Sequence, residues 1–220
     1  MSLSKVIEAA REDIGYHEEP AGSNRVKYWD EFAPGLQGQP WCVAFLWSVF
    51  RQAGESAAFC GGDRIAGCRQ LLEWYASQGL DFPAEAAQAG DIALLSFSGA
   101  AEAQHCGLIL NAERGPDGRL LWVDTIEGNT SSGTAGSPDN GGCVAEKLRY
   151  PRNILRVCRP QYQPEGNSID DITGHWAEQS IRSIRAAGLM QGYPDGSFRP
   201  DQPVTRAELA VILKRWEESK

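Results

Sequence analysis

Residues 40–53 read Pro-Trp-Cys-Val-Ala-Phe-Leu-Trp-Ser-Val-Phe-Arg-Gln-Ala. Apolar side chains occupy nearly every position of this stretch, which predicts a helix that is buried on all sides. Pro40 suits the first turn of a helix, and Gly54 suits the position just after the last turn. Such a helix has to lie inside a domain, so the rest of the chain must supply the layers that surround it.

The remaining patterns place helices before strands. Further helices are expected over residues 1–15 and 68–77. Strands are expected over residues 92–97, 105–112, 120–126, 144–148 and 154–158. Helices followed by consecutive strands are typical of an α+β domain, here with an antiparallel sheet of about five strands.

The turn between the second and third of these strands determines how the two strands pair. Its residues, Pro116-Asp117-Gly118, suit a type I turn followed by a left-handed glycine, which together make a three-residue hairpin loop. Counting outward from this loop places His105 opposite Asn129, with Glu127 diagonal to His105 on the same face. A slip of one residue would move His105 to the other face. The hairpin therefore predicts a cluster of His105, Glu127 and Asn129.

Cys42 is expected in the first turn of the buried helix, where the positive end of the helix dipole lowers the pKa of a thiol. A thiolate, a histidine that moves its proton and a third group that orients the histidine form a nucleophilic catalyst. A structural interpretation stays open beside this one. Cys42 can fill space in the core, His105 can be an ordinary hydrogen-bonding residue, and Glu127 and Asn129 can cap the turn that follows.

Four motifs resemble the CHAP family of cysteine amidases and peptidases: Pro-Trp-Cys-x-Ala-Phe at residues 40–45, Gly-Asp-Ile at 90–92, Gln-His-Cys-Gly-Leu-Ile at 104–109 and Thr-Ile-Glu-Gly-Asn at 125–129. Residues 14–18 and 23–28 are similar to bacterial and phage members, and the resemblance covers roughly residues 3–160. It implies a papain-like (NlpC/P60-type) fold with N-terminal helices. It also implies hydrolysis of peptidoglycan, as an N-acetylmuramoyl-L-alanine amidase or a cross-bridge endopeptidase.

The resemblance implies a role for each candidate residue. Cys42 is the nucleophile, His105 the general base and acid, and Glu127 the orienting residue. Asn129 is either a second orienting residue or a contact to substrate. The chain departs from the family at Cys106, which follows the histidine where the family often has a small aliphatic residue.

The oxyanion of such a reaction needs hydrogen-bond donors. The backbone N–H of Cys42 is the natural donor, and the side-chain amide of Gln39 is a second candidate. Gln39 can equally be a solvated loop residue. Neither a cofactor nor a metal ion is expected, because thiol and imidazole carry the whole reaction.

Composition excludes some partners. The chain has 220 residues, 42% of them hydrophobic, and a formal net charge of −8. An acidic chain without a run of lysine or arginine is not expected to bind nucleic acid. No stretch approaches the ~20 apolar residues that cross a bilayer, so a membrane is not an expected partner either. The N-terminus lacks the basic start, apolar segment and cleavage site of a secretory signal.

The six cysteines contain no Cys-x-x-Cys pair, so a structural zinc site is not expected. A chain of this length can hold a core without disulfides, which favours free buried thiols. Cys60 and Cys68, on either side of a glycine-rich turn, are the exception that the sequence leaves open. A metal-binding module that uses Cys42, His105 and Cys106 is a further alternative, which stoichiometric zinc would support.

A change of composition divides the chain. Residues 161–168 contain proline, glycine and polar residues and are expected to link a domain at 1–160 to another at 169–220. The second domain has apolar spacings typical of two helices. Thr205 and Glu208 form a capping box at the start of the second helix.

The second domain resembles one S-layer homology (SLH) repeat, through Asp-Ile-Thr-Gly-His-Trp-Ala at residues 171–177, Gly-Tyr-Pro-Asp-Gly-Ser-Phe at 192–198 and Val-Thr-Arg-Ala-Glu at 204–208. This family binds secondary polymers of the cell wall. The matching positions imply that Arg206 contacts an anionic sugar group with Asp171 and Trp176 nearby, although Trp176 can also be a core residue. The family usually carries three tandem repeats, so a single repeat is expected to self-associate, as a trimer.

Together these features predict a two-domain peptidoglycan hydrolase that works outside the cell, at the wall. Without a recognisable signal peptide, it would act in phage-type lysis or after release from lysed cells. The rival hypothesis is a wall-binding protein whose first domain has lost catalysis. Loss of wall lysis in Cys42→Ala, with binding retained, would separate the two.

Overall fold

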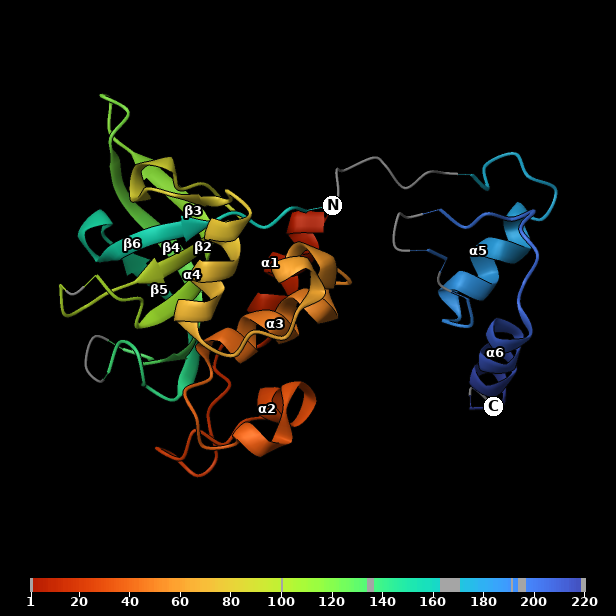
Figure 1. Ribbon diagram of the computed structural model, residues 1–220, viewed down its shortest axis with the longest axis horizontal. Helices are drawn as coiled ribbons and strands as arrows, with labels where there is room; N and C mark the ends of the chain where they lie inside the picture. The colour runs from red at the N-terminus through yellow and green to blue at the C-terminus, as the bar shows by residue number, and fades with distance from the viewer. Residues whose placement is uncertain are drawn as a thin grey trace. The chain divides into compact units, whose positions relative to one another are not determined.

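The computed structural model describes residues 2–99, 101–133, 137–162, 171–190, 192–193 and 197–218 (Figure 1). Its internal contacts divide the chain into two compact units, residues 1–163 and 164–220, and each is described by itself. Residues 163–168 of the expected linker lie outside the described residues. Within the described ranges, no helix is both long and apolar enough to cross a membrane.

The first unit is an α+β domain built on an antiparallel sheet. Its helices are α1 (Ser2–Glu12), α2 (Lys27–Phe32), α3 (Cys42–Gln52) and α4 (Cys68–Ser77). Its strands are β1 (Asp81–Phe82), β2 (Ile92–Leu95), β3 (His105–Arg114), β4 (Leu120–Thr130), β5 (Cys143–Arg149) and β6 (Ile154–Cys158). In the described part of the chain these six strands form one sheet in the order β1-β6-β2-β3-β4-β5, and every neighbouring pair is antiparallel.

The α+β class with an antiparallel sheet is thus confirmed, but the sheet has one strand more than expected. The additional strand, β1, has two residues and pairs with β6 at the edge. A strand of two residues carries no alternating pattern, and the six-residue helix α2 is too short to show helical periodicity. Both elements form because the surrounding structure holds them.

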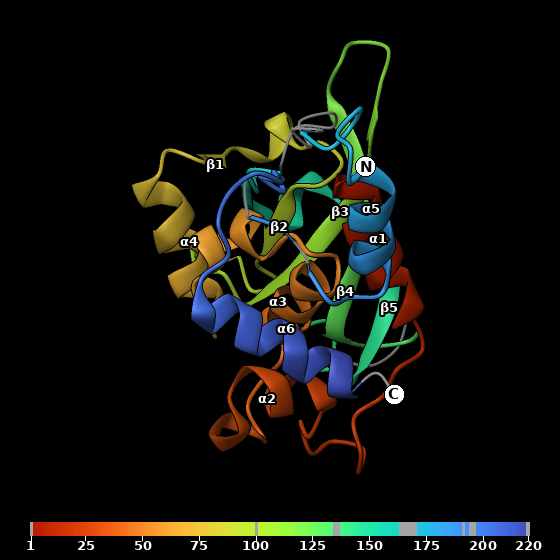
Figure 2. The same cartoon turned by 90° about the vertical axis from the view of Figure 1, so that its right-hand side faces the viewer.

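The buried helix predicted from the sequence is present as α3. Side chains from Cys42 through Phe50 are all buried, and Gly54 takes a left-handed conformation (φ 76°) just after the helix. Helices α1, α3 and α4 lie against one face of the sheet (Figures 1 and 2), and α3 contacts both β3 and β4. The N-terminus of α3 is therefore held against the two strands that carry the other candidate residues.

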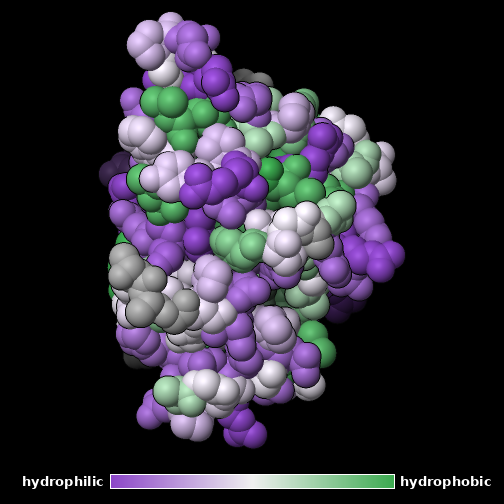
Figure 3. Space-filling view, turned by 90° about the vertical axis from the view of Figure 1, so that its left-hand side faces the viewer, coloured by the Kyte–Doolittle hydropathy of each residue, from purple (hydrophilic) through white to green (hydrophobic). Residues whose placement is uncertain are grey.

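Strand β2 buries both of its faces. Along β2, Ile92 and Leu94 belong to the core shared with the helices, whereas Ala93 and Leu95 belong to a second apolar cluster on the other face. This alternation is what a sheet with two covered faces requires. The side of the unit away from the helices has a mostly hydrophilic surface with small, separate apolar patches (Figure 3).

The hairpin of β3 and β4 keeps its expected register at both ends. The pairing next to the turn, Arg114 with Leu120, and the pairing far from it, Leu108 with Ile126, both fit a regular hairpin. Between them the ladder shifts by one residue at an irregularity near the turn and shifts back at a second one after Ile109. The two bulges lie on different strands and cancel.

Candidate active site

Cys42 is the first residue of α3 and has 4% of its surface exposed. The residue before it, Trp41, is fully buried and stacks on Tyr28 with a ring-centroid distance of 5.3 Å, which fixes where the helix begins. The Sγ atom of Cys42 lies 3.6 Å from Sγ of Cys68, the first residue of α4. Cys106 belongs to the same cluster, because all three sulfurs lie within 4.8 Å of one another.

The surroundings of Cys42 favour its thiolate form. Hydrogen bonds from Cys106 and Cys68 lower the pKa of Cys42 well below its usual value, and His105 adds to this effect, while burial opposes it. Burial and the two neighbouring sulfurs raise the pKa of Cys106 well above its usual value. A hydrogen bond with Cys106 lowers the pKa of Cys68, but Cys42 and burial raise it more. These opposite shifts favour ionisation of Cys42 over that of Cys68 and Cys106.

His105 is the first residue of β3 and is fully buried. Its Nε2 atom lies 3.0 Å from Oε2 of Glu127, while its Nδ1 atom has no hydrogen-bond partner within the described ranges. Burial alone would lower the pKa of His105, but Cys42 and Glu127 together raise it to about 9. Both shifts favour a thiolate at Cys42 beside a protonated His105.

Glu127 is fully buried on β4 and is held by three donors besides His105. Arg149 donates from Nε to Oε1 at 2.8 Å and from Nη2 to Oε2 at 2.5 Å, and Thr125 Oγ1 donates to Oε1 at 2.7 Å. Burial would raise the pKa of Glu127, but Arg149 and His105 lower it to about 2. Arg149 was not singled out from the sequence, and together with His105 it keeps Glu127 ionised.

Two glycines make this arrangement sterically feasible. A Cβ atom at Gly107 would lie 2.5 Å from Cγ of Glu127, so only glycine leaves room for that side chain. A Cβ atom at Gly128 would lie 2.6 Å from Cβ of Phe45, which lies on α3 one turn after the cysteine. The first glycine lets Glu127 reach His105, and the second lets α3 lie close to β4.

Gly107→Ala should destabilise the first unit by about 1–3 kcal/mol, because the new methyl group overlaps Glu127. It should also lower the pKa of His105 from about 9, since the displaced carboxylate no longer stabilises the imidazolium. Urea denaturation and an NMR titration of the imidazole measure the two effects. Gly35→Ala is the control, because a Cβ atom there meets nothing within 4 Å. Equal stability and equal imidazole titration in the two variants would contradict the steric role of Gly107.

Asn129 and Gln39 lie apart from this network. Asn129 has a left-handed backbone (φ 61°); its amide nitrogen donates to Oδ1 of Asn140 at 2.9 Å, and its amide oxygen accepts from the N–H of Gly142 at 3.2 Å. These bonds hold the chain before β5, and none of them orients His105. Gln39 is exposed in the bend before α3, where its backbone carbonyl accepts a hydrogen bond from Trp29. A substrate contact by Asn129 and an oxyanion contact by Gln39 stay predictions.

All six cysteines are free and buried. Free buried thiols were the expectation, and the pairing that the sequence left open for Cys60 and Cys68 does not occur. Cys68 lies beside Cys42 instead. Of the remaining thiols, Cys143 donates to the carbonyl of Thr130 at 2.8 Å, away from the site.

The second unit contains helices α5 (Glu178–Ala186) and α6 (Arg206–Glu218). The capping box at the start of α6 is present: the N–H of Thr205 donates to Glu208 at 2.7 Å, and the N–H of Glu208 donates to Oγ1 of Thr205 at 3.2 Å. A small apolar cluster joins Ile172, Ile181 and Phe198.

The residues expected near a wall polymer have different surroundings. The carboxylate of Asp171 accepts hydrogen bonds from the N–H groups of Phe198 (2.9 and 3.0 Å) and Arg199 (2.5 Å), so it fixes the chain there. Trp176 is 90% exposed, which excludes the core position that the sequence left open. Arg206 is exposed on the first turn of α6.

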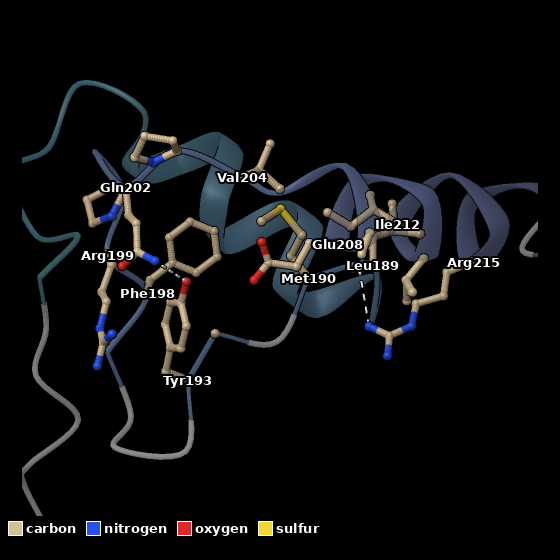
Figure 4. Close-up of a pocket in the computed structure, with 15 residues that line it drawn as sticks. Leu189, Met190, Tyr193, Phe198, Arg199, Gln202, Val204, Glu208, Ile212 and Arg215 are labelled. Atoms are coloured by element: carbon tan, nitrogen blue, oxygen red, sulfur yellow. Dashed lines mark hydrogen bonds between the residues drawn. The ribbon is translucent and has the colours of Figure 1, made fainter.

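A pocket of about 460 Å³ lies elsewhere on this unit, between α6 and the chain on either side of Phe198 (Figure 4). Its charged and polar lining residues include Tyr193, Arg199, Glu208 and Arg215. Sequence reasoning missed this pocket, because its residues come from three separate stretches without a shared motif. None of the three residues predicted to contact a polymer lines it.

Residues 168–210 match the family model of the S-layer homology domain. The chain is 40% identical over 69 residues to outer membrane protein SlpA of Deinococcus radiodurans, and 51% identical over 39 residues to cell surface glycoprotein 1 of Acetivibrio thermocellus. A cellulosome-anchoring protein of the latter organism is 43% identical over 47 residues.

These three alignments cover 31%, 18% and 21% of this chain and 6%, 2% and 10% of the relatives. The chain thus spans a tenth or less of the length of these curated relatives. No solved structure matches the chain. The C-terminal unit is therefore similar to the SLH domains of cell-surface proteins, over residues 168–210.

Proposed function

We propose that the first unit is a cysteine amidase or endopeptidase that cleaves amide bonds in peptidoglycan, and that the SLH segment holds it on the cell wall. The contact of His105 with Glu127, beside the thiolate of Cys42, carries the proposal. The CHAP-like motifs that supply these three residues support the substrate class. A buried helix that begins with the nucleophile, followed by an antiparallel sheet, supports a papain-like (NlpC/P60-type) fold.

In the first half of the reaction, the Cys42 thiolate attacks the carbonyl carbon of a peptide amide and forms a C–S bond. The resulting oxyanion accepts a hydrogen bond from the backbone N–H of Cys42, and the side-chain amide of Gln39 is the second candidate donor. As the C–N bond breaks, His105 gives its Nδ1 proton to the leaving amine. Nδ1 has no hydrogen-bond partner among the described residues, so it is suited to this transfer.

In the second half, neutral His105 accepts a proton from water while the water oxygen attacks the thioester carbon. The C–S bond then breaks, the carboxylic acid leaves and the thiolate of Cys42 returns. Glu127 keeps the imidazole oriented throughout and stabilises its charged form. Arg149 does not touch the substrate in this scheme; it positions Glu127.

The pH profile should show an alkaline limit set by His105. Activity requires the thiolate and the imidazolium together, and the imidazolium is lost as pH rises through about 9. We therefore expect kcat/KM to fall above that pH. Turbidity loss of purified peptidoglycan, measured from pH 5 to 11 at constant ionic strength, gives the profile.

Glu127→Gln is the matched variant for this profile. Its neutral amide no longer stabilises the imidazolium, so the alkaline limit should move to lower pH. An alkaline limit near pH 6.5 in the unmodified chain, or one unmoved in Glu127→Gln, would exclude the thiolate–imidazolium pair as the active form.

The bond that is cleaved can be identified from the products. Mass spectrometry of purified peptidoglycan after digestion should show either peptide stems released from muramic acid or cross-bridges opened to a new amine. Glycan fragments with intact stems would instead indicate a glycosidase and would overturn the proposal. No change of the wall, together with tight binding to it, would favour the rival wall-binding protein without catalysis.

Anchoring by the SLH segment has a separate test. The relatives with matching segments are cell-surface or anchoring proteins by name. A wall-bound enzyme has a raised effective concentration on its insoluble substrate. The full chain carrying Cys42→Ala should sediment with walls that retain their secondary polymer but not with walls stripped of it. Arg206→Ala should weaken this sedimentation; equal sedimentation with both kinds of wall would exclude the polymer as partner.

The second unit also has a surface that suits self-association. Leu209, Val211 and Leu213 on α6 are 45–55% exposed, so one helix of this small unit leaves much apolar area uncovered. A trimer that rebuilds a three-repeat arrangement would cover it. Light scattering should give three times the chain mass at micromolar concentration, and a monomer there would count against the trimer.

A further inference from the structure

Three thiols from three separate elements meet beside the imidazole of His105. Cys42 opens α3, Cys68 opens α4, and Cys106 is the second residue of β3. The sulfurs of Cys42 and Cys68 are 3.6 Å apart, and all three sulfurs lie within 4.8 Å of one another. All three residues are buried. A catalytic thiol needs one imidazole partner, and beyond their hydrogen bonds to Cys42 the mechanism gives Cys68 and Cys106 no part.

We propose that Cys42, Cys68 and Cys106 form a metal-binding site for Zn²⁺, with the fourth position beside His105. Thiolate sulfurs bind zinc at about 2.3 Å, which places sulfurs about 3.8 Å apart around a tetrahedral ion. The observed separations, 3.6 Å and no more than 4.8 Å, need shifts of about 1 Å at most to reach this geometry. Soft sulfur ligands select zinc over magnesium or calcium.

The surroundings of His105 match those of a metal-binding histidine. Such a histidine commonly gives one ring nitrogen to the metal and the other to a carboxylate, which orients the ring. Nε2 of His105 already bonds to Glu127 at 3.0 Å, while Nδ1 is buried and unpartnered in the part of the chain that the structure describes. Nδ1 can therefore serve as the fourth ligand.

Charge also favours metal binding. Three thiolates would exceed the charge of one Zn²⁺, and the excess lies at the N-termini of α3 and α4, where helix dipoles stabilise negative charge. Cys68 and Cys106 must lose their protons to bind. The affinity for zinc should therefore rise with pH.

A bound ion would inhibit the proposed enzyme, and this consequence rests on the proposed function. The lone pair of Cys42 that would attack an amide carbonyl would be shared with the ion. Metal binding and nucleophilic attack therefore exclude each other. Zinc should inhibit hydrolysis with one ion per chain, and a chelator should restore it.

The test is a titration of the reduced, metal-free full chain with Co²⁺, followed by Zn²⁺. We expect thiolate-to-cobalt charge-transfer absorption that saturates at one Co²⁺ per chain and disappears when Zn²⁺ displaces it. Glu127→Gln should weaken binding about 10–100-fold. Cys68→Ser and Cys106→Ser should weaken it further. Cys143→Ser, at a buried thiol outside the cluster, should bind like the unmodified chain.

X-ray absorption at the zinc edge tests the same site without a variant. Three sulfur neighbours at about 2.3 Å are expected around the ion. A shell of oxygen and nitrogen alone, or cobalt binding that survives both serine variants unchanged, would overturn the site. Hydrolysis that depends on Cys42 but is not inhibited by zinc would also overturn the metal site, although the proposed enzyme activity would then be supported. If zinc has three sulfur neighbours but the chain does not hydrolyse peptidoglycan, the metal site is supported and the proposed enzyme activity is wrong.

Discussion

Cys42→Ala is expected to reduce peptidoglycan hydrolysis at least about 10⁴-fold, because in the proposed mechanism the thiolate forms the covalent intermediate and no other described group can replace it. Cys68 and Cys106 lie close but have raised pKa values, so neither supplies a second thiolate. Initial rates of dye release from labelled walls measure the loss. Wall binding should be retained, since the change lies in the first unit.

Cys106→Ala is a useful companion to this variant. It removes the thiol whose hydrogen bond contributes most to the low pKa of Cys42, but it leaves the nucleophile in place. We expect a smaller loss of rate and an acidic limit of the pH profile that moves to higher pH.

Should Cys42→Ala retain more than about one hundredth of the rate with unchanged folding, the covalent mechanism is wrong.

Arg149→Met is expected to lower the free energy of unfolding by about 3–5 kcal/mol at neutral pH. Removing the guanidinium leaves the carboxylate of Glu127 fully buried without its main partner, and a lone buried charge costs more than the ion pair contributes. Urea denaturation gives the change. Arg149→Met/Glu127→Gln should recover part of the loss, because the second substitution removes the unpaired charge.

The effect should depend on pH with a definite sign. The pKa of Glu127 is about 2, below its usual value of 4.5, so its contribution to stability is complete above pH 4.5 and is lost as pH falls toward 2. The difference between the unmodified chain and Arg149→Met should therefore shrink as pH falls. Arg156→Met, at a partly exposed ion pair with Asp81, should cost within about 1 kcal/mol. If Arg149→Met lowers the free energy of unfolding by a similarly small amount, Arg149 is not what stabilises the buried carboxylate of Glu127.

The predicted register of the hairpin shows how much of the site can be predicted from local sequence. Turn chemistry at residues 116–118 set the pairing next to the turn, and Glu127 contacts His105 as that pairing predicts. The two bulges between these points have no signal in the sequence. A single bulge would have put His105 on the wrong face. The predicted contact of His105 with Glu127 forms because the second bulge restores the register, whereas Asn129 bonds to Asn140 and Gly142 instead.

Other parts of the site could not be predicted, for a different physical reason. Arg149 meets Glu127 from β5, and Cys68 meets Cys42 from α4, so both contacts depend on how elements pack in three dimensions. Spacing rules for metal sites look for cysteines close in sequence, whereas these sulfurs come from positions 42, 68 and 106. Burial of Cys42 and of the helix it opens was predictable, since hydrophobicity alone determines it.

The cancelling bulges of β3 and β4 limit how the hairpin can be shortened. Residues 110–124 lie beyond the second bulge, but they are part of the domain, since Val123 is fully buried and pairs with Arg149. Removing the one extra residue from each strand would discard both irregularities at once and keep the register between His105 and Glu127. Deleting one irregularity alone would invert the inward and outward residues of the rest of the ladder.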